Sequence, residues 1–356
     1  MSSLKHREFC KAATRAGLRY VTDGVAGISR RRSGKGWSYY DADGARIGDP
    51  IMRERLDALV IPPAWVNVWI CPDPDGHIQV TARDARSRKQ YRYHPSYREA
   101  RDQSKFRHML EFSEVLPMLR ERVERDLRAG EQTRRQLLAS VVWLLDRTLI
   151  RVGNDEYART NNSYGLTTML KKHAKITGTQ LRFCFFGKSG VEHTVSVNDP
   201  RLARIVQRCK DTHGQEIFQY LDASGKRKPI LSDDVNKYLR KVSGRDITAK
   251  DFRTWGGTMV AAVALRTMGP ATSRSEADRN ILRALDAVAE RLGNARAVCR
   301  KYYVHPALLN AYHLGLTAPH SQVPETRNVH RDLSQAALRR DELMVLQFLH
   351  ESVSPA

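Results

Sequence analysis

The residues best suited to chemistry gather in one stretch near the end of the chain, residues 291–306. A helical pattern ends there at Gly293, a residue suited to the position just after a helix. A short basic segment follows and leads into Tyr302 and Tyr303. A tyrosine flanked by cations can contact a phosphate and attack it as a nucleophile. The more common role of such a pair is a half-buried anchor, so the rest of the chain must decide between the two.

Cationic residues elsewhere lie where the backbone would hold them in place. Arg151 follows a long predicted helix, and Lys188 lies at the tip of a predicted hairpin. Lys250 and Arg253 fall in the first turn of another predicted helix, which Thr248 caps. The spacing of three puts this lysine and arginine on one helix face, at an N-terminus that favours phosphate. A C-capping arginine and a solvated basic face are the ordinary alternatives.

The N-terminal elements that would support these residues are mainly strands. Strands are predicted over 37–40 and 45–47, and again over 77–81 and 89–93, each pair joined by a polar connection. The second hairpin is rich in arginine, with interleaved tyrosines. Neighbouring side chains of a strand point to opposite faces, so the cations could meet phosphates while the rings rest on sugars or on the core. A solvated basic hairpin is the alternative.

From about residue 97 the pattern becomes helical. Apolar residues recur at helical spacing over 115–123, 137–149 and 281–291. A further hairpin is predicted from strands over 180–186 and 191–197. After residue 318 a polar linker leads to a last helix, roughly 333–350, and its apolar residues predict docking onto the body: Leu343, Leu346, Phe348 and Leu349.

These patterns predict an α+β protein. A small N-terminal β-rich domain over 1–100 precedes a larger, mainly α-helical domain with a short β-hairpin over 101–318. A linker and C-terminal helix over 319–356 complete the chain.

Composition narrows the class of partner. The 356 residues carry a net charge of +21, which implies a polyanion, either nucleic acid or an acidic membrane surface. No apolar run is long enough to cross a bilayer, and the N-terminus lacks the apolar core of a signal peptide. The five cysteines are scattered and show neither metal-ligand spacing nor a disulfide framework. We therefore expect a reduced, cytoplasmic protein associated with the nucleoid.

Incomplete motifs narrow the chemistry. Gly187, Lys188 and Ser189 look like part of a nucleotide-binding loop, but Arg182 stands where its first glycine is required. The aspartate-rich loops lack the later ligands of a calcium site, and no histidine and glutamate have zincin spacing. We expect no cofactor: neither ATP nor metal, with chemistry carried by arginine, lysine, tyrosine and asparagine.

Taken in order, these residues resemble a known family. The segments Arg-Val-Gly-Asn at 151–154, Phe-Gly-Lys-Ser-Gly at 186–190 and Lys-Asp-Phe-Arg-Thr-Trp at 250–255 each look like one of its motifs. So do residues 83–95 and Lys-Tyr-Tyr at 301–303. Together they resemble the type IB DNA topoisomerases, in particular the compact poxviral and bacterial branch, from about residue 20 to 315. The fold expected for the helical domain is then the one shared with tyrosine recombinases.

The resemblance implies roles for single residues. Tyr303 would attack a DNA phosphate and form a 3′-phosphotyrosyl link. In the family the nucleophile stands nine residues after the Gly-Asn pair, here Gly293-Asn294, and this position is Tyr303 and not Tyr302. Arg151 and Arg253 would hold the phosphate oxygens. Lys188 would protonate the departing 5′ oxygen. Lys250 would assist that proton transfer.

One position departs from the family pattern. Many members carry histidine where Asn294 stands. An amide donates a neutral N–H and does not titrate near pH 7. Asn294 is therefore expected to bond a phosphate oxygen and is excluded as a general base.

The partner implied is double-stranded DNA, bound by a monomer and clamped between the two domains. Phosphate contacts would dominate that clamp. The DNA contacts are predicted for Arg83, Arg86, Arg88, Lys89, Tyr91, Arg92, Tyr93 and Tyr157. A phosphotyrosyl ester keeps the free energy of the original diester, so resealing after relaxation of torsion needs no ATP.

Two other functions remain open. A tyrosine recombinase uses a similar set of arginine, lysine and tyrosine, but is expected to carry histidine at the position of Lys250 and an α-helical arm-binding domain. A non-catalytic basic DNA-binding protein would have the same charge. It would not need Arg151, Lys188, Arg253 and Tyr303 in this order.

Overall fold

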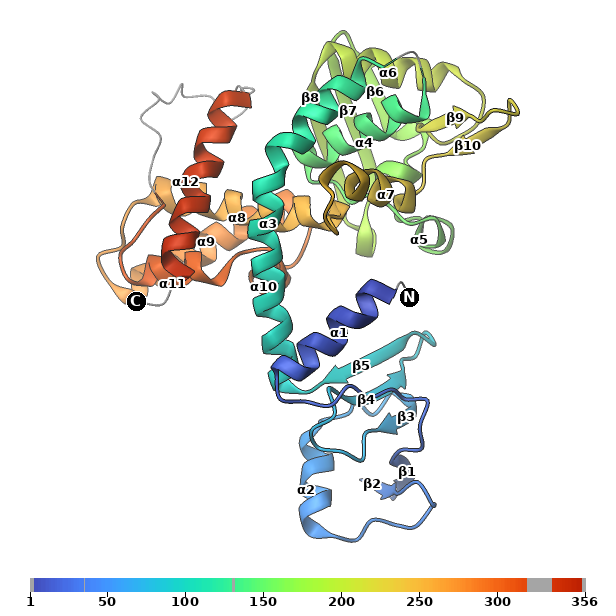
Figure 1. Ribbon diagram of the computed structural model, residues 1–356, viewed down its shortest axis with the longest axis vertical. Helices are drawn as coiled ribbons and strands as arrows, with labels where there is room; N and C mark the ends of the chain where they lie inside the picture. Colours follow the sequence, from blue (N-terminus) through green and yellow to red (C-terminus); the bar gives the residue numbers. More distant parts are fainter. Residues whose placement is uncertain (1–2, 35, 130–131, 319–334, 354–356) are drawn as a thin grey trace. The chain divides into compact units, whose positions relative to one another are not determined.

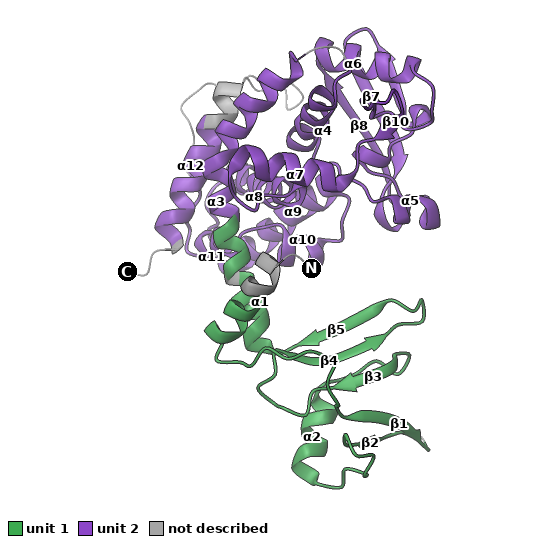
Figure 2. Ribbon diagram, turned by 45° about the vertical axis from the view of Figure 1, so that its right-hand side comes forward, with its two compact units in different colours: residues 1–108 green, residues 109–356 purple. Residues whose placement is uncertain are grey.

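The computed structural model describes residues 3–34, 36–129, 132–318 and 335–353 (Figure 1). The chain forms two compact units, Met1–His108 and Met109–Ala356, coloured separately in Figure 2. The boundary falls inside one helix, α3 (Pro95–Leu127), whose start near the predicted change of character is confirmed. The predicted α+β class is confirmed, with β-sheets first and a mostly helical region after them. The predicted divisions at residues 100 and 318 stay predictions.

Unit 1 carries strands and also two helices that the sequence patterns did not predict. Its helices are α1 (Ser3–Arg15) and α2 (Pro50–Ala58). Its strands are β1 (Ser29–Ser33), β2 (Gly36–Tyr40), β3 (Val66–Ile70), β4 (Ile78–Arg83) and β5 (Lys89–Tyr93). The strands β3, β4 and β5 form one antiparallel sheet, and β1 pairs with β2.

One of the two predicted hairpins of unit 1 is confirmed in full, and the other is confirmed only as a tight antiparallel turn in which Ile47 N–H bonds the Tyr39 carbonyl at 2.9 Å. Strands β4 and β5 pair across the polar connection as expected. Around Asp41, however, the pairing stops after a single bridge between Tyr40 and Arg46. The Asp41 carboxylate accepts the backbone N–H groups of Asp43 and Ala45, which closes a local turn without a ladder. The long partner of β2 is β1, whose Ser-Arg-Arg-Arg-Ser sequence has no apolar alternation to reveal it.

Unit 2 holds most of the helices. The helices that precede its three-stranded sheet are the rest of α3, α4 (Arg134–Thr148) and α5 (Asp155–Asn161). The later ones are α6 (Pro200–Asp211), α7 (Ser232–Ser243), α8 (Ala249–Met268), α9 (Arg274–Leu292), α10 (Arg296–Tyr302), α11 (Pro306–His313) and α12 (Gln335–Val353). Short 3₁₀ turns η1 (Leu166–Thr168), η2 (Lys171–His173) and η3 (Lys188–Gly190) complete the helical elements.

Small sheets interrupt these helices. The strands β6 (Ala174–Thr177), β7 (Gln180–Phe186) and β8 (Glu192–Asn198) form one antiparallel sheet. The predicted hairpin is its β7–β8 pair, with Lys188 in the connection. A second small pair, β9 (Gln219–Leu221) with β10 (Arg227–Pro229), was not predicted. Within the described part of the chain no helix is long and apolar enough to cross a membrane.

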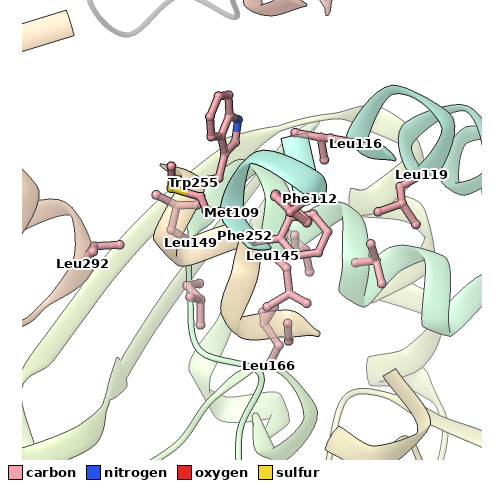
Figure 3. Close-up of a cluster of buried hydrophobic side chains, with 14 of the residues drawn as sticks. Met109, Phe112, Leu116, Leu119, Leu145, Leu149, Leu166, Phe252, Trp255 and Leu292 are labelled. Atoms are coloured by element: carbon pink, nitrogen blue, oxygen red, sulfur yellow. The ribbon is translucent and has the colours of Figure 1, made fainter. Parts of the chain in front are cut away.

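The core of unit 2 includes buried side chains of α3, α4 and α8, together with Leu149, which follows α4 (Figure 3). Phe112 of α3 meets Phe252 of α8 edge to face, with ring centroids 4.9 Å apart. Leu149 ends α4 in the left-handed region at φ 58°, an uncommon conformation for leucine. A Cβ on Gly256 would lie 2.5 Å from a Leu149 methyl, so glycine on α8 is what lets the two segments approach.

The C-terminal helix α12 docks onto this body, as its pattern predicted. Val345 and Leu349 are fully buried, whereas Leu343 is 60% exposed, so that part of the predicted contact is wrong. The predicted linker lies in residues 319–334, outside the described residues. Glu342 of α12 accepts from Arg120 of α3 at 2.5 Å and from the Trp255 indole of α8 at 3.2 Å. The α12 helix therefore contacts α8, which carries Arg253.

We expect Arg120→Ala to lower the free energy of unfolding by about 3 kcal/mol or more. Arg120 bridges Asp146 and Glu342, and these three side chains are only 12–15% exposed. Removing the cation leaves two carboxylates with no partner of opposite charge. Chemical denaturation measures the loss. Arg245→Ala, which breaks the exposed pair with Glu114, is the matched control and should cost under about 1 kcal/mol. Equal losses would contradict the expectation.

Candidate active site

The loop after α4 places Arg151 through its backbone. Its carbonyl accepts the N–H of Leu166 at 2.9 Å, and a second bond joins Thr167 N–H to the Val152 carbonyl. A Cβ on Gly165 would lie 2.5 Å from the backbone nitrogen of Gly153, so this crossing of two segments requires glycine. Tyr164 N–H bonds the Phe186 carbonyl at 2.8 Å, which joins the loop to the β7–β8 hairpin.

Arg253 is buried and clamped by backbone carbonyls. Its side chain donates from Nη1 to the Leu149 carbonyl and from Nη2 to the Leu292 carbonyl at 2.8 Å. Its Nε is buried and has no acceptor among the described residues. The predicted cap of α8 is confirmed, because the Asp251 carboxylate accepts from Thr248 N–H at 2.8 Å. The guanidinium is thus fixed in place before any ligand arrives.

Asn294 lies directly against Arg151. Arg151 Nη2 donates to Asn294 Oδ1, and a guanidinium can only donate, which fixes the orientation of the amide. Asn294 Nδ2 is then buried and has no acceptor within the part of the chain described. Gly293 holds the preceding turn at φ 58°, as its position after α9 predicted. The arrangement leaves one buried N–H donor on each of Asn294 and Arg253 without an acceptor among the described residues.

Tyr303 faces the same arginine. The Arg253 Cζ atom lies 5.3 Å from the centroid of the Tyr303 ring. The backbone is held on α8, where Thr258 Oγ1 donates to the Tyr303 carbonyl at 3.2 Å. A Cβ on Gly257 would lie 2.8 Å from that carbonyl, so a small residue is needed there. Tyr302 is 40% exposed and lies against Lys301, so of the two tyrosines the structure brings Tyr303 to the arginines.

Electrostatics at this site favour an anion. Burial lowers the pKa of Arg151, and it lowers the pKa of Arg253 to about 10, with repulsion from Arg151 adding to the effect. Both side chains stay cationic at neutral pH. Burial also lowers the pKa of His193, and both arginines oppose its protonation. Two fixed cations near a tyrosine can neutralise the oxygens of a phosphoryl group during transfer.

The structure does not bring the two candidate lysines into this group. Lys188 is exposed at the tip of the β7–β8 hairpin, and Lys250 is exposed in the first turn of α8. Lys250 and Arg253 lie three apart in the first turn of α8 as predicted, but Arg253 turns into the core and is only 4% exposed, so the two do not form one solvent-facing pair. Sequence spacing did not foresee that backbone carbonyls would draw this arginine inward.

The predicted DNA-contacting residues of unit 1 differ in how many contacts their side chains already make with other residues of the protein. Arg86 and Tyr91 are exposed on or near the β4–β5 hairpin. Arg92 instead donates a hydrogen bond to the Val60 carbonyl at 2.6 Å, and its guanidinium lies over the Trp65 ring. The others have local partners or partial burial: Arg83 with Ser87, Arg88 with Asp84, Lys89 with Asp23, and Tyr93 stacked on Tyr91. Tyr157, in unit 2, is 46% exposed on α5.

Sequence reasoning missed His193, which lines the same hollow as Arg151 and Arg253. The only local signal was its alternation with Val195 on β8, which puts it on the inward face. It also missed Thr258, whose hydroxyl accepts from His305 N–H at 3.1 Å and so holds the Tyr303 segment at a second point.

Two protein families match the chain. Residues 94–329 match the family described as Eukaryotic DNA topoisomerase I, catalytic core. Residues 36–84 match the one described as Bacterial DNA topoisomerase IB, N-terminal domain. The first match includes every residue of the site above, from Arg151 to Tyr303.

Curated relatives agree with these families. The chain is 31% identical to DNA topoisomerase 1B of Acanthamoeba polyphaga mimivirus, over 81% of this chain and 88% of the relative. It is 21% identical to DNA topoisomerase I of Monkeypox virus, over 64% of this chain and 69% of the relative. It is 23% identical to DNA topoisomerase 1B of Vaccinia virus (strain Copenhagen), over 49% of this chain and 52% of the relative. These matches show that the chain belongs to the type IB DNA topoisomerases, enzymes that cleave and reseal DNA.

Proposed function

We propose that Tyr303 is the nucleophile and that it forms a 3′-phosphotyrosyl link with one strand of duplex DNA. The observation that carries this proposal is that Arg151, Arg253, Asn294 and Tyr303, from separate segments, meet around one set of unused donors. The Tyr303 hydroxyl releases its proton to solvent water, and its oxygen bonds to phosphorus as the bond to the 5′ oxygen breaks. Lys188 gives that oxygen its proton. Attack by the resulting 5′ hydroxyl on the same phosphorus reverses the step and reseals the strand.

The roles of the other residues follow from charge and geometry. Arg151 and Arg253 neutralise the non-bridging oxygens, and Asn294 donates through Nδ2. Lys250 is exposed in the first turn of α8, three residues before Arg253, and it assists the proton transfer. Backbone carbonyls hold the Arg253 guanidinium, and Arg151 and Asn294 hold each other, so these donors need little reorganisation when charge develops.

We further propose that the enzyme works as a monomer clamped on chromosomal DNA in the cytoplasm, with no metal or nucleotide cofactor. The match of residues 36–84 to a bacterial N-terminal domain supports this setting. The free energy of the diester is stored in the phosphotyrosyl bond, so ATP is not needed for resealing. Lys250 stands where a tyrosine recombinase is expected to have histidine, which favours the topoisomerase over that alternative.

We expect the protein to relax supercoils of both signs in EDTA without ATP. The reason is that cationic side chains of the protein occupy the role that a metal would fill. Agarose gels of a plasmid with no special site measure the activity. Tyr303→Phe protein, purified in parallel, is the control for contaminating enzymes. A strict requirement for magnesium would refute the proposed chemistry, and binding without relaxation would favour a non-catalytic DNA-binding protein.

We expect Arg86→Gln to weaken DNA binding and reduce the slope of log affinity against log salt by about 0.9. Arg86 is exposed on the connection between β4 and β5, where it could reach a phosphate. Titrations at several salt concentrations measure the slope. Arg340→Gln on α12 removes an equally exposed cation and should leave the slope unchanged. An unchanged slope for Arg86→Gln would mean that this hairpin does not touch the DNA backbone.

A further inference from the structure

The His193 ring lies between the segment that carries Lys188 and the segment that carries Asn294. A Cβ on Gly187 would lie 2.6 Å from His193 Cδ2 and Nε2, so the ring fills the space beside that glycine. A Cβ on Gly293 would lie 2.7 Å from His193 Nε2. Each glycine directly precedes a proposed catalytic residue, Lys188 in one case and Asn294 in the other. One imidazole therefore touches the backbone next to both.

The ring itself is held firmly. His193 on β8 pairs with Phe185 on β7, and the two rings stack with centroids 5.2 Å apart at an interplanar angle of 14°. Gly187 N–H bonds the Val191 carbonyl at 2.7 Å, which closes the hairpin around Lys188. The ring, the strand pair and the closed connection form one packed body. A change at the ring must therefore displace the connection or the Gly293 turn.

We propose that His193 is a positioning residue of the cleavage reaction: its ring sets the β7–β8 connection against the Gly293 turn and so fixes where Lys188 stands relative to Asn294. The inference rests on the proposed role of Lys188. Lys188 is exposed in the β7–β8 connection, so its position depends on how that connection is held. Misplacing a reacting group by about 1 Å can slow a reaction by roughly 100-fold. His193 itself need not touch the phosphate.

A double-mutant cycle tests whether His193 acts on cleavage through Lys188. His193→Ala should slow single-turnover cleavage at saturating enzyme by about 10-fold or more, with DNA affinity unchanged. In the Lys188→Ala background the same substitution should slow cleavage by less than about 2-fold, because the group it positions is already gone. A merely structural histidine would slow both backgrounds equally, and that outcome overturns the inference. If Lys188→Ala cleaves as fast as wild type, both this inference and the proposed role of Lys188 fail.

Gly187→Ala disturbs the same contact by changing the glycine instead of the histidine. It provides a second test if His193→Ala does not fold. Gly187 has φ −91°, which alanine adopts without strain, so the added methyl acts only by pushing on the ring. Gly187→Ala should slow cleavage as His193→Ala does, and its loss should also vanish in the Lys188→Ala background. Ser189→Ala is the control in the same connection, since Ser189 is exposed and the change removes one hydroxyl without adding an atom. Wild-type cleavage by Gly187→Ala would overturn the inference.

Discussion

Tyr303→Phe is expected to abolish the covalent protein–DNA adduct and supercoil relaxation while leaving DNA binding nearly intact. The substitution removes only the phenolic oxygen that would bond to phosphorus, and no other group can replace a nucleophile. The ring still packs near Arg253, whose Cζ lies 5.3 Å from its centroid, so the site should keep its shape. A denaturing gel of protein with labelled duplex detects the adduct, and a filter-binding titration measures affinity.

The adjacent tyrosine supplies the control. Tyr302→Phe makes the same chemical change one residue earlier, on a side chain that is 40% exposed and lies against Lys301. It should retain both adduct and relaxation. If the two results were exchanged, Tyr302 would be the nucleophile and the neighbours assigned here to Tyr303 would have no role in attack. Loss of adduct in both variants would point to a disturbed α10 rather than to chemistry.

Local signals predicted the parts of the fold whose cause is local. The cap of α8 needs only Thr248 and Asp251, three residues apart, and the turn after α9 needs only glycine at 293. The β7–β8 hairpin was predicted from two alternating runs and the short connection between them. The spacing of apolar residues over 281–291 predicted the helix α9 but not which of its residues face the core. Ile281 is buried in α9 while Leu282, one position on, is 40% exposed.

The gathering of the site could not be predicted from spacing. Arg151 and Asn294 are 143 residues apart, and their hydrogen bond depends on how α4, α9 and the sheet pack. The resemblance to a family brought these residues into one set, but it did not indicate that carbonyls of Leu149 and Leu292 would hold Arg253. Nor could it show that His193 lies beside two glycines far apart in sequence, because that contact exists only in the packed structure.

Lys188→Ala is expected to cleave ordinary DNA at least roughly 100-fold more slowly than wild type, but to cleave a strand with a bridging 5′ sulfur at nearly the wild-type rate. The argument rests on the leaving group. A departing 5′ alkoxide has a conjugate-acid pKa near that of water, about 16, and must be protonated as it leaves. A thiol has a pKa of about 8.5, so a thiolate leaves without help. Single-turnover cleavage of the two substrates measures the difference.

Arg151→Ala is the matched control, because it removes a cation of the same site with a different task. Arg151 is held against Asn294 and would contact non-bridging oxygens, whose charge develops whichever atom leaves. Its loss should slow both substrates by about the same factor, roughly 100-fold or more. If sulfur rescues neither variant, Lys188 positions the DNA and does not donate the proton. The donor must then be sought at Lys250, the other cation exposed near this site, by the same pair of substrates.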